Sequence, residues 1–138
     1  MRIIKLPVVV LGLWCLLLLT VAPAGAHHAF AAEYDSTRPV EFQGTVTKVE
    51  LINPHSWITI DVRLDDGTTE SWEIEAGAPN SLYRRGFTRD SLPIGTEVTV
   101  RGYRAKYEGL KRANGGSITM LDGSTIFLGG SNPNNRDR

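Results

Sequence analysis

Three histidines are the residues of this sequence whose types and spacing could do chemistry, and that chemistry is metal binding. His27 and His28 follow Ala24-Gly25-Ala26, small residues that a signal peptidase recognises, so we expect cleavage there to make His27 the first mature residue. A terminal histidine offers its α-amine and its imidazole Nδ1 to one metal ion, and a third nitrogen would complete a T-shaped set that favours Cu(II). His55 could supply that nitrogen from the turn Asn53-Pro54-His55, or His28 could bind through its own imidazole and amide.

The histidine pattern resembles the histidine brace of exported copper proteins, so copper is the one cofactor that the sequence suggests. The alternative is that His27 and His28 are solvated terminal residues and that His55 hydrogen-bonds within its own turn. The strand preceding His55 starts near Val40, and a straight strand of that length would place its start roughly 30 Å away. Residues 27–39 would then have to run back along the strand for His27 to reach His55.

A second candidate site surrounds Trp57. Alternation over residues 57–64 puts Ile58 and Ile60 on one face of a strand and Trp57 on the other. An exposed aromatic ring among polar groups would be a stacking platform for a sugar or peptide. Alternatively, Trp57 packs beneath the N-terminal segment, against Phe30 or Tyr34. The residues of this candidate ligand-binding face are Trp57, Thr59, Asp61, Glu73 and Glu75.

No residue pattern predicts catalysis. Arg84, Arg85 and Arg89 could form an anion site, although we expect them to be solvated or bonded to carboxylates such as Asp90. The sequence has no Gly-x-Ser-x-Gly nucleophile motif, no phosphate-binding P-loop and no Cys/His zinc spacing. These observations favour a non-catalytic protein.

The first 26 residues have the three parts of a signal peptide. Arg2 and Lys5 form a positive start, Leu6 to Val21 form an apolar run, and the small residues of the cleavage site follow. The run of about 16 residues is shorter than the roughly 20 that a membrane-spanning helix needs. We therefore expect an exported protein, periplasmic in location, that is not held in the membrane after cleavage.

The expected mature chain of 112 residues is long enough for one domain with a modest core. It carries 13 basic and 15 acidic residues, a formal charge of −2, without a basic cluster. This balance argues against nucleic acid as a partner. The single cysteine, Cys15, lies in the leader, so sheet packing and not a disulfide must hold the mature domain.

The mature chain contains a series of evenly spaced strand patterns. A first strand runs from Val40 with a change of face near Gly44 to Lys48, which predicts a bulge or sharp bend. The turn Asp65-Asp66-Gly67-Thr68 joins the strand of residues 57–64 to the next strand, and a short helix follows from Pro79 to Arg85 before Gly86. Later strands are expected at 97–103, 117–121 and 125–128. The residues expected in one buried core are Ile60, Val62, Trp72, Ile74, Val98 and Val100.

Three strands, a short helix and further strands are the chain order of an OB-fold, a five-stranded Greek-key barrel with a long bent first strand. We therefore predict an all-β domain of this type, with the helix between strands 3 and 4; a small β-sandwich is the alternative. The expected boundaries are a signal peptide at 1–26, an N-terminal segment at 27–39, the barrel at 40–128 and a disordered tail at 129–138.

Several motifs in order resemble one bacterial family. They are His27-His28-Ala29-Phe30, Gly44-Thr45-Val46, Asn53-Pro54-His55-Ser56-Trp57, the run from Pro79 to Gly86, and Gly102-Tyr103-Arg104-Ala105. Together they resemble domain of unknown function 6152. The resemblance implies an exported bacterial protein with an OB-like barrel and implies no reaction; Ala29 departs from the serine expected there.

Two functions follow from these patterns. The first is a non-catalytic exported binding or adaptor module of OB type, whose partner is a small ligand or a periplasmic protein. The second is a copper protein, either a carrier or a redox site, that binds the metal through His27.

Overall fold

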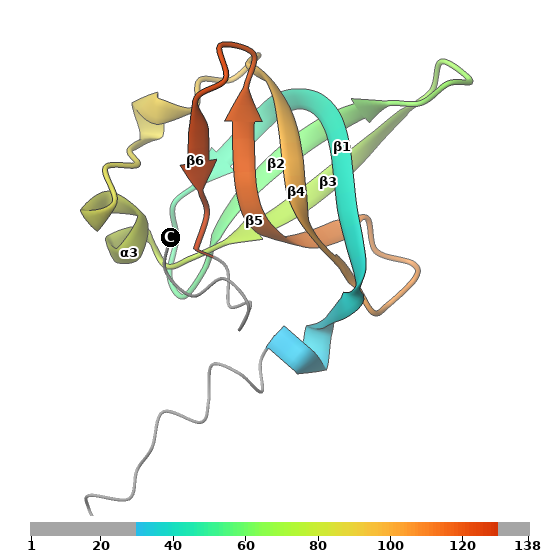
Figure 1. Ribbon diagram of the computed structural model, residues 1–138, viewed down its shortest axis with the longest axis horizontal. Coiled ribbons are helices and arrows are strands. Elements are labelled where there is room, and N and C mark those ends of the chain that lie inside the picture. Colours follow the sequence, from blue (N-terminus) through green and yellow to red (C-terminus); the bar gives the residue numbers. More distant parts are fainter. Residues whose placement is uncertain (1–29, 130–138) are drawn as a thin grey trace, which may run out of the picture.

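A computed structural model describes residues 30–129 of the protein, and its strands close into a ring (Figure 1). A helical turn at residues 30–33 precedes the first strand. The elements that follow are β1 (Tyr34–Glu50), β2 (Ser56–Arg63), β3 (Thr69–Ala76), α3 (Pro79–Arg84), the 3₁₀ turn η1 (Arg89–Ser91), β4 (Glu97–Ala105), β5 (Arg112–Met120) and β6 (Thr125–Phe127).

The ring runs β1–β2–β3–β5–β4 and back to β1, with β6 added to the edge of β5. All neighbouring strands are antiparallel except β3 and β5, whose short parallel pairing joins Glu73 to Arg112 and Glu75 to Asn114. The short helix α3 lies between β3 and β4. The predicted all-β, OB-like barrel with one short helix is confirmed.

Strand β1 is long and strongly bent, because one half pairs with β4 and the other with β2 (Figure 1). The predicted change of face is a register shift against β2 between Val46 and Lys48. A Cβ on Gly44 would lie 2.6 Å from the carbonyl oxygen of Asp61, so glycine allows the two strands to approach closely at the bend. The strand begins at Tyr34, six residues before the start near Val40 that alternation indicated.

Strand β5 also begins earlier than the sequence pattern indicated, at Arg112 and not at Ser117. Gly115 and Gly116, which precede the expected strand at 117–121, lie within β5. A Cβ on Gly115 would lie 2.7 Å from Cγ2 of Ile74, so the missing side chain lets β5 pack against β3 where the barrel closes.

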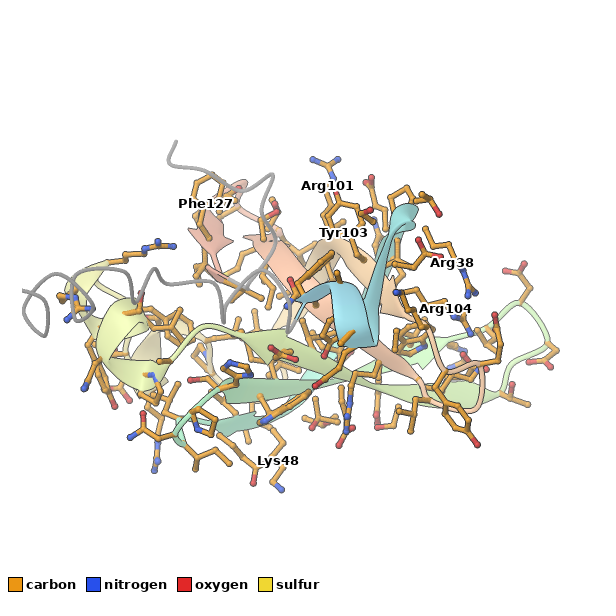
Figure 2. The ribbon with its side chains drawn as sticks, turned by 90° about the horizontal axis from the view of Figure 1, so that it is seen from below. Arg38, Lys48, Arg101, Tyr103, Arg104 and Phe127 are labelled. Atoms are coloured by element: carbon orange, nitrogen blue, oxygen red, sulfur yellow. The ribbon has the colours of Figure 1, made fainter. Side chains whose placement is uncertain are left out.

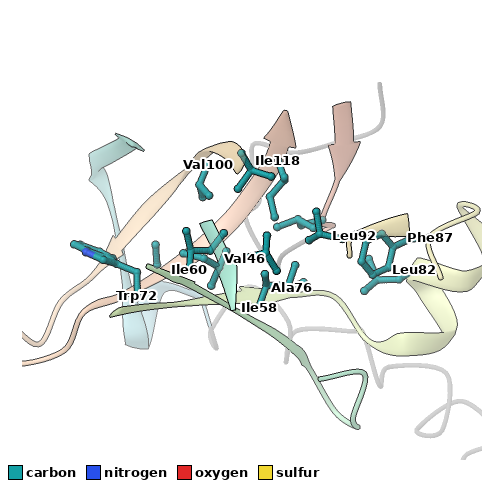
Figure 3. Close-up of a cluster of buried hydrophobic side chains, with 14 of the residues drawn as sticks. Val46, Ile58, Ile60, Trp72, Ala76, Leu82, Phe87, Leu92, Val100 and Ile118 are labelled. Carbon is teal, nitrogen blue, oxygen red and sulfur yellow. The ribbon is translucent and has the colours of Figure 1, made fainter. Parts of the chain in front are cut away.

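The barrel core contains all six residues predicted for it, each at most 8% exposed. Figure 3 shows Val46, Ile60 and Val100 from three strands meeting inside the barrel. Helix α3 adds Leu82 at one end, where it packs with Phe87 and Leu92. The helix thus closes an end of the barrel with apolar side chains.

A smaller core holds the N-terminal helical turn against β4. Phe30 stacks on Tyr34 at 5.7 Å between ring centroids and meets Tyr103 edge-on at 5.8 Å. Phe30, Tyr34 and Ala105 are each at most 3% exposed. In Figure 2 this turn lies over the strand that carries Tyr103 and Arg104. The segment before the barrel is therefore part of the folded domain.

Candidate functional site

The most concentrated group of polar side chains lies on the outer face where β2, β3 and β5 meet. Trp57 of β2 is opposite Glu75 of β3, and Thr59 is opposite Glu73. Glu73 in turn pairs with Arg112 of β5. The loop between β1 and β2 adds His55 immediately before β2. In an OB-fold this loop and the face of strands 2 and 3 form the ligand-binding surface.

Glu75 lies on the outer face, as alternation predicts, yet it is only 3% exposed. The reason is that two side chains cover it. Tyr34 Oη donates to Glu75 Oε2, and His55 Nδ1 lies 2.8 Å from Glu75 Oε1. A buried carboxylate is costly unless it is hydrogen-bonded or paired, so these two contacts make the position tolerable for a charged residue.

The hydroxyl group of Tyr34 is a permanent donor in this arrangement. Burial raises the pKa of Tyr34 well above its ordinary value, and the hydrogen bond to the Glu75 carboxylate raises it further. The phenol therefore remains protonated at neutral pH, and Glu75 acts as the acceptor.

The imidazole of His55 is held at one nitrogen and open at the other. Nδ1 lies 2.8 Å from the Glu75 carboxylate, which leaves Nε2 as the ring nitrogen that could bind a ligand. The His55 side chain is 39% exposed, against 4% for Glu75. A buried acid thus orients a surface imidazole from below, as carboxylates commonly do for histidines that bind metals.

The ring of Trp57 is covered by a cation. The guanidinium of Arg112 lies 4.6 Å from the centre of the ring, and its Nη2 donates to Glu73 Oε2 at 2.6 Å. It is Arg112 that lies over Trp57, whereas Phe30 packs against Tyr34 and Tyr103. Glu73 and Trp57 are therefore both engaged by one arginine, although the Glu73 side chain remains 52% exposed.

Thr59 and Asp61, the other two residues of the predicted face, lie further along β2 from His55. Thr59 is half-buried beside Glu73, and its carbonyl oxygen accepts from Thr47 Oγ1 at 3.3 Å. Asp61 accepts from Ser71 Oγ at 2.6 Å and lines a separate open groove of about 440 Å³ at the bend of β1. The structure thus brings Trp57, Glu73 and Glu75 together with His55 and separates Asp61 from them.

Sequence reasoning missed Tyr34 and Arg112 as members of this group. Tyr34 precedes the alternating pattern of β1, and Arg112 precedes the pattern that indicated β5. Both reach the site through distant pairings, since the hydrogen bond from Tyr34 to Glu75 spans 41 positions and that from Arg112 to Glu73 spans 39. The aromatic residues near the start of the mature chain were the one feature of the sequence that could have indicated the role of Tyr34.

The predicted metal ligands are only partly described. His27 and His28 lie outside the described residues, as do the predicted signal peptide and tail. Within residues 30–129, no three His, Cys, Asp or Glu side chains gather in a way that could hold a metal ion.

Arg84, Arg85 and Arg89 are exposed near the end of α3 and in η1. In the part of the chain that the structure describes, no helix is long and apolar enough to cross a membrane.

The chain belongs to the family of unknown function DUF6152, whose pattern matches residues 16–113. The match extends from the predicted leader through β1 to β4 and into β5, so it includes Tyr34, His55, Glu75 and Arg112. No curated protein and no solved structure matches the chain.

Proposed function

We propose that this protein is an exported, non-catalytic binding module of OB type that acts in the periplasm and takes its ligand at the face of His55. One observation carries the proposal: a half-exposed imidazole is fixed by a buried carboxylate on the surface that OB-folds use for ligands. Burying Glu75 costs stability that an apolar residue would not cost. A site held rigidly from beneath is what selective binding requires.

Export is part of this proposal and rests on the leader. If the protein is processed as Ala24 and Ala26 suggest, N-terminal sequencing of the exported form begins His-His-Ala-Phe. Recovery of the protein in the cytoplasmic fraction with Met1 intact would contradict export.

The binding module is tested by the mass of the native protein. The protein is purified from the exported fraction without denaturation, and its intact mass is compared with that of the His55→Ala variant. We expect an extra mass on the wild type that His55→Ala lacks. Lys48→Ala, whose side chain is 60% exposed, is the matched control and keeps the adduct. An adduct that survives in His55→Ala would place the ligand elsewhere.

Copper binding through the mature N-terminus is the second candidate, and a specific observation favours it. Tyr34 and His55 contact the same carboxylate, so the start of β1, which follows the segment from the predicted terminus, lies near His55. The expected separation of roughly 30 Å assumed a straight strand starting near Val40. The bend of β1 and its start at Tyr34 remove that obstacle.

His27 is close in sequence to the first residue that the structure describes. His27 precedes the buried Phe30 by three positions, and three residues span about 10 Å when extended. In the proposed centre, the α-amine and Nδ1 of His27 and Nε2 of His55 supply three nitrogens to Cu(II), with His28 as the alternative third donor. The Glu75 carboxylate would act on the metal only through His55.

Copper binding is tested with Cu(II) added to protein that begins at His27. We expect one equivalent to bind with a nitrogen-rich electron paramagnetic resonance spectrum. Affinity should fall as the pH is lowered, because protons compete for the same nitrogens.

Two variants separate the centre from ordinary histidine binding. One extra residue before His27 keeps every imidazole and moves the amine, so it should weaken binding sharply. His55→Ala asks whether the loop supplies the third nitrogen. Equal affinity of the extended and native proteins would reject the role of the amine, and binding no tighter than that of a His-His peptide would reject the centre.

A further inference from the structure

We propose that Glu75 and Tyr34 are positioning residues, and that the Glu75 carboxylate couples docking of the N-terminal segment (residues 30–34) to the orientation of the His55 imidazole. The inference rests on the proposed function for its biological meaning, because His55 is the ligand-facing group there. The coupling itself is a property of the ligand-free protein and can be measured without any ligand.

The geometry gives each partner its own carboxylate oxygen. Tyr34 Oη donates to Oε2 and His55 Nδ1 lies 2.8 Å from Oε1, so the two contacts do not compete for one oxygen. Tyr34 is the first residue of β1, and His55 lies in the loop between β1 and β2. Glu75 therefore joins the start of β1 to this loop.

The two bonds strengthen one another through burial. When the N-terminal segment is docked, Tyr34 is 2% exposed and covers Glu75, so the bond from His55 to the carboxylate is made out of water. Hydrogen bonds are stronger in such surroundings. When the segment is undocked, water would solvate Glu75 and compete with His55 for it. Docking therefore favours the fixed imidazole, and by linkage the fixed imidazole favours docking.

The segment has other attachments, so the coupling can be disturbed without releasing it. Phe30 stacks on Tyr34, the Lys106 amide donates to the Glu33 carbonyl at 2.9 Å, and Lys106 Nζ donates to the Ala31 carbonyl. Tyr34→Phe keeps the stacked ring and removes only the hydroxyl. The Lys106 amide is a convenient reporter of docking, since its partner lies in the segment.

The consequence for His55 is a fixed tautomer. With Nδ1 2.8 Å from the Glu75 carboxylate, the tautomer favoured for the neutral imidazole has its hydrogen on Nδ1 and its lone pair on Nε2. Without Glu75, both tautomers become accessible and the ring can turn. A purely structural role for the Tyr34–Glu75 bond would not alter the protonation pattern of His55.

The test combines two nuclear magnetic resonance measurements on ligand-free protein. Imidazole ¹⁵N shifts should show a protonated Nδ1 and an unprotonated Nε2 in the wild type, and a mixture of tautomers in Tyr34→Phe. Hydrogen exchange of the Lys106 amide should be about 3- to 10-fold faster in His55→Ala, the range that loss of one hydrogen bond produces. Ser71→Ala, which removes the bond to Asp61, is the control and should change neither measurement.

Glu75→Gln provides a second variant of nearly unchanged size, and it should mix the tautomers as Tyr34→Phe does. Unchanged ¹⁵N shifts in Tyr34→Phe, or Lys106 exchange in His55→Ala equal to that in Ser71→Ala, would overturn the coupling. A protein that shows the coupling but binds neither copper nor a native ligand would refute the proposed function and leave this inference standing. Binding at His55 without the coupling would refute this inference and leave the proposed function standing.

Discussion

Glu75 is the residue whose environment departs most from its sequence pattern. Alternation places it on the outer face of β3, where a glutamate is ordinarily solvated. Three neighbours from other parts of the chain change this: Tyr34 donates to it, His55 Nδ1 lies 2.8 Å from it, and Asn114 pairs with it along β5. A buried carboxylate that serves a surface imidazole lowers stability locally at a candidate site, where such departures from simple rules concentrate.

The raised pKa of Tyr34, caused by burial and by its hydrogen bond to Glu75, predicts how the stability of the fold responds to alkaline pH. Its pKa in the folded state lies above the unfolded value of about 10, so this residue stabilises the fold below pH 10 and the contribution is lost as the pH rises above it. The free energy of unfolding should therefore fall above pH 10 by up to about 1.4 kcal/mol per pH unit from this group. Urea unfolding followed by tryptophan fluorescence measures the slope. Tyr34→Phe should flatten it, whereas Tyr107→Phe, at a residue 70% exposed, should not.

Strand β1 is the element that arranges the site, because its bend brings its start next to Glu75 and its end next to the loop of His55. The sequence predicted the bend from the change of face and placed Gly44 within it. It did not predict the start of the strand. Residues 34–39 lack alternation because their environment is set by β4 and the N-terminal turn, and β4 lies far away in sequence.

Gly44→Ala tests the tight approach at the bend. The new methyl group would lie 2.6 Å from the Asp61 carbonyl oxygen and 2.6 Å from Cγ2 of Ile60, so backbone and core must move. We expect a loss of about 1–3 kcal/mol in the free energy of unfolding, the usual range for overpacking. Gln43→Ala, at the exposed neighbouring position, should change it by less than about 0.5 kcal/mol. A neutral Gly44→Ala variant would mean that the strands can separate at this point without cost.

For the whole molecule, the order of elements identified the barrel, and the inward residues of the antiparallel strands identified its core. These features depend on local periodicity, which sequence displays directly. The closure between β3 and β5 was not visible, because it pairs Glu73 with Arg112 through residues that show no strand pattern. Arg112 reaches the candidate site through that closure, and Tyr34 reaches it through the start of β1, which pairs with β4. Trp57, Glu73, Glu75 and His55 could therefore be named from sequence, while Tyr34 and Arg112 could not.

The single core predicts a large cost for truncation at its centre. Ile60 is fully buried among residues of several strands, so Ile60→Ala should lower the free energy of unfolding by about 2–5 kcal/mol. Chemical denaturation monitored by circular dichroism measures this loss. Ile94→Ala is the matched control, because Ile94 is 69% exposed and its truncation should have little effect. Similar losses for the two variants would contradict the arrangement of the core.

The parallel pairing of β3 with β5 also has a consequence for how the chain acquires its fold. The first strand must find β4, where Glu41 meets Arg101 across 60 positions, and the ring closes only when residues 112–114 reach β3. High contact order of this kind slows folding to the millisecond-to-second range. Until that moment β3 has a free edge, which can recruit strands from other chains. A fragment that stops before Arg112 should therefore aggregate, whereas one that stops after Leu128 should fold as a monomer.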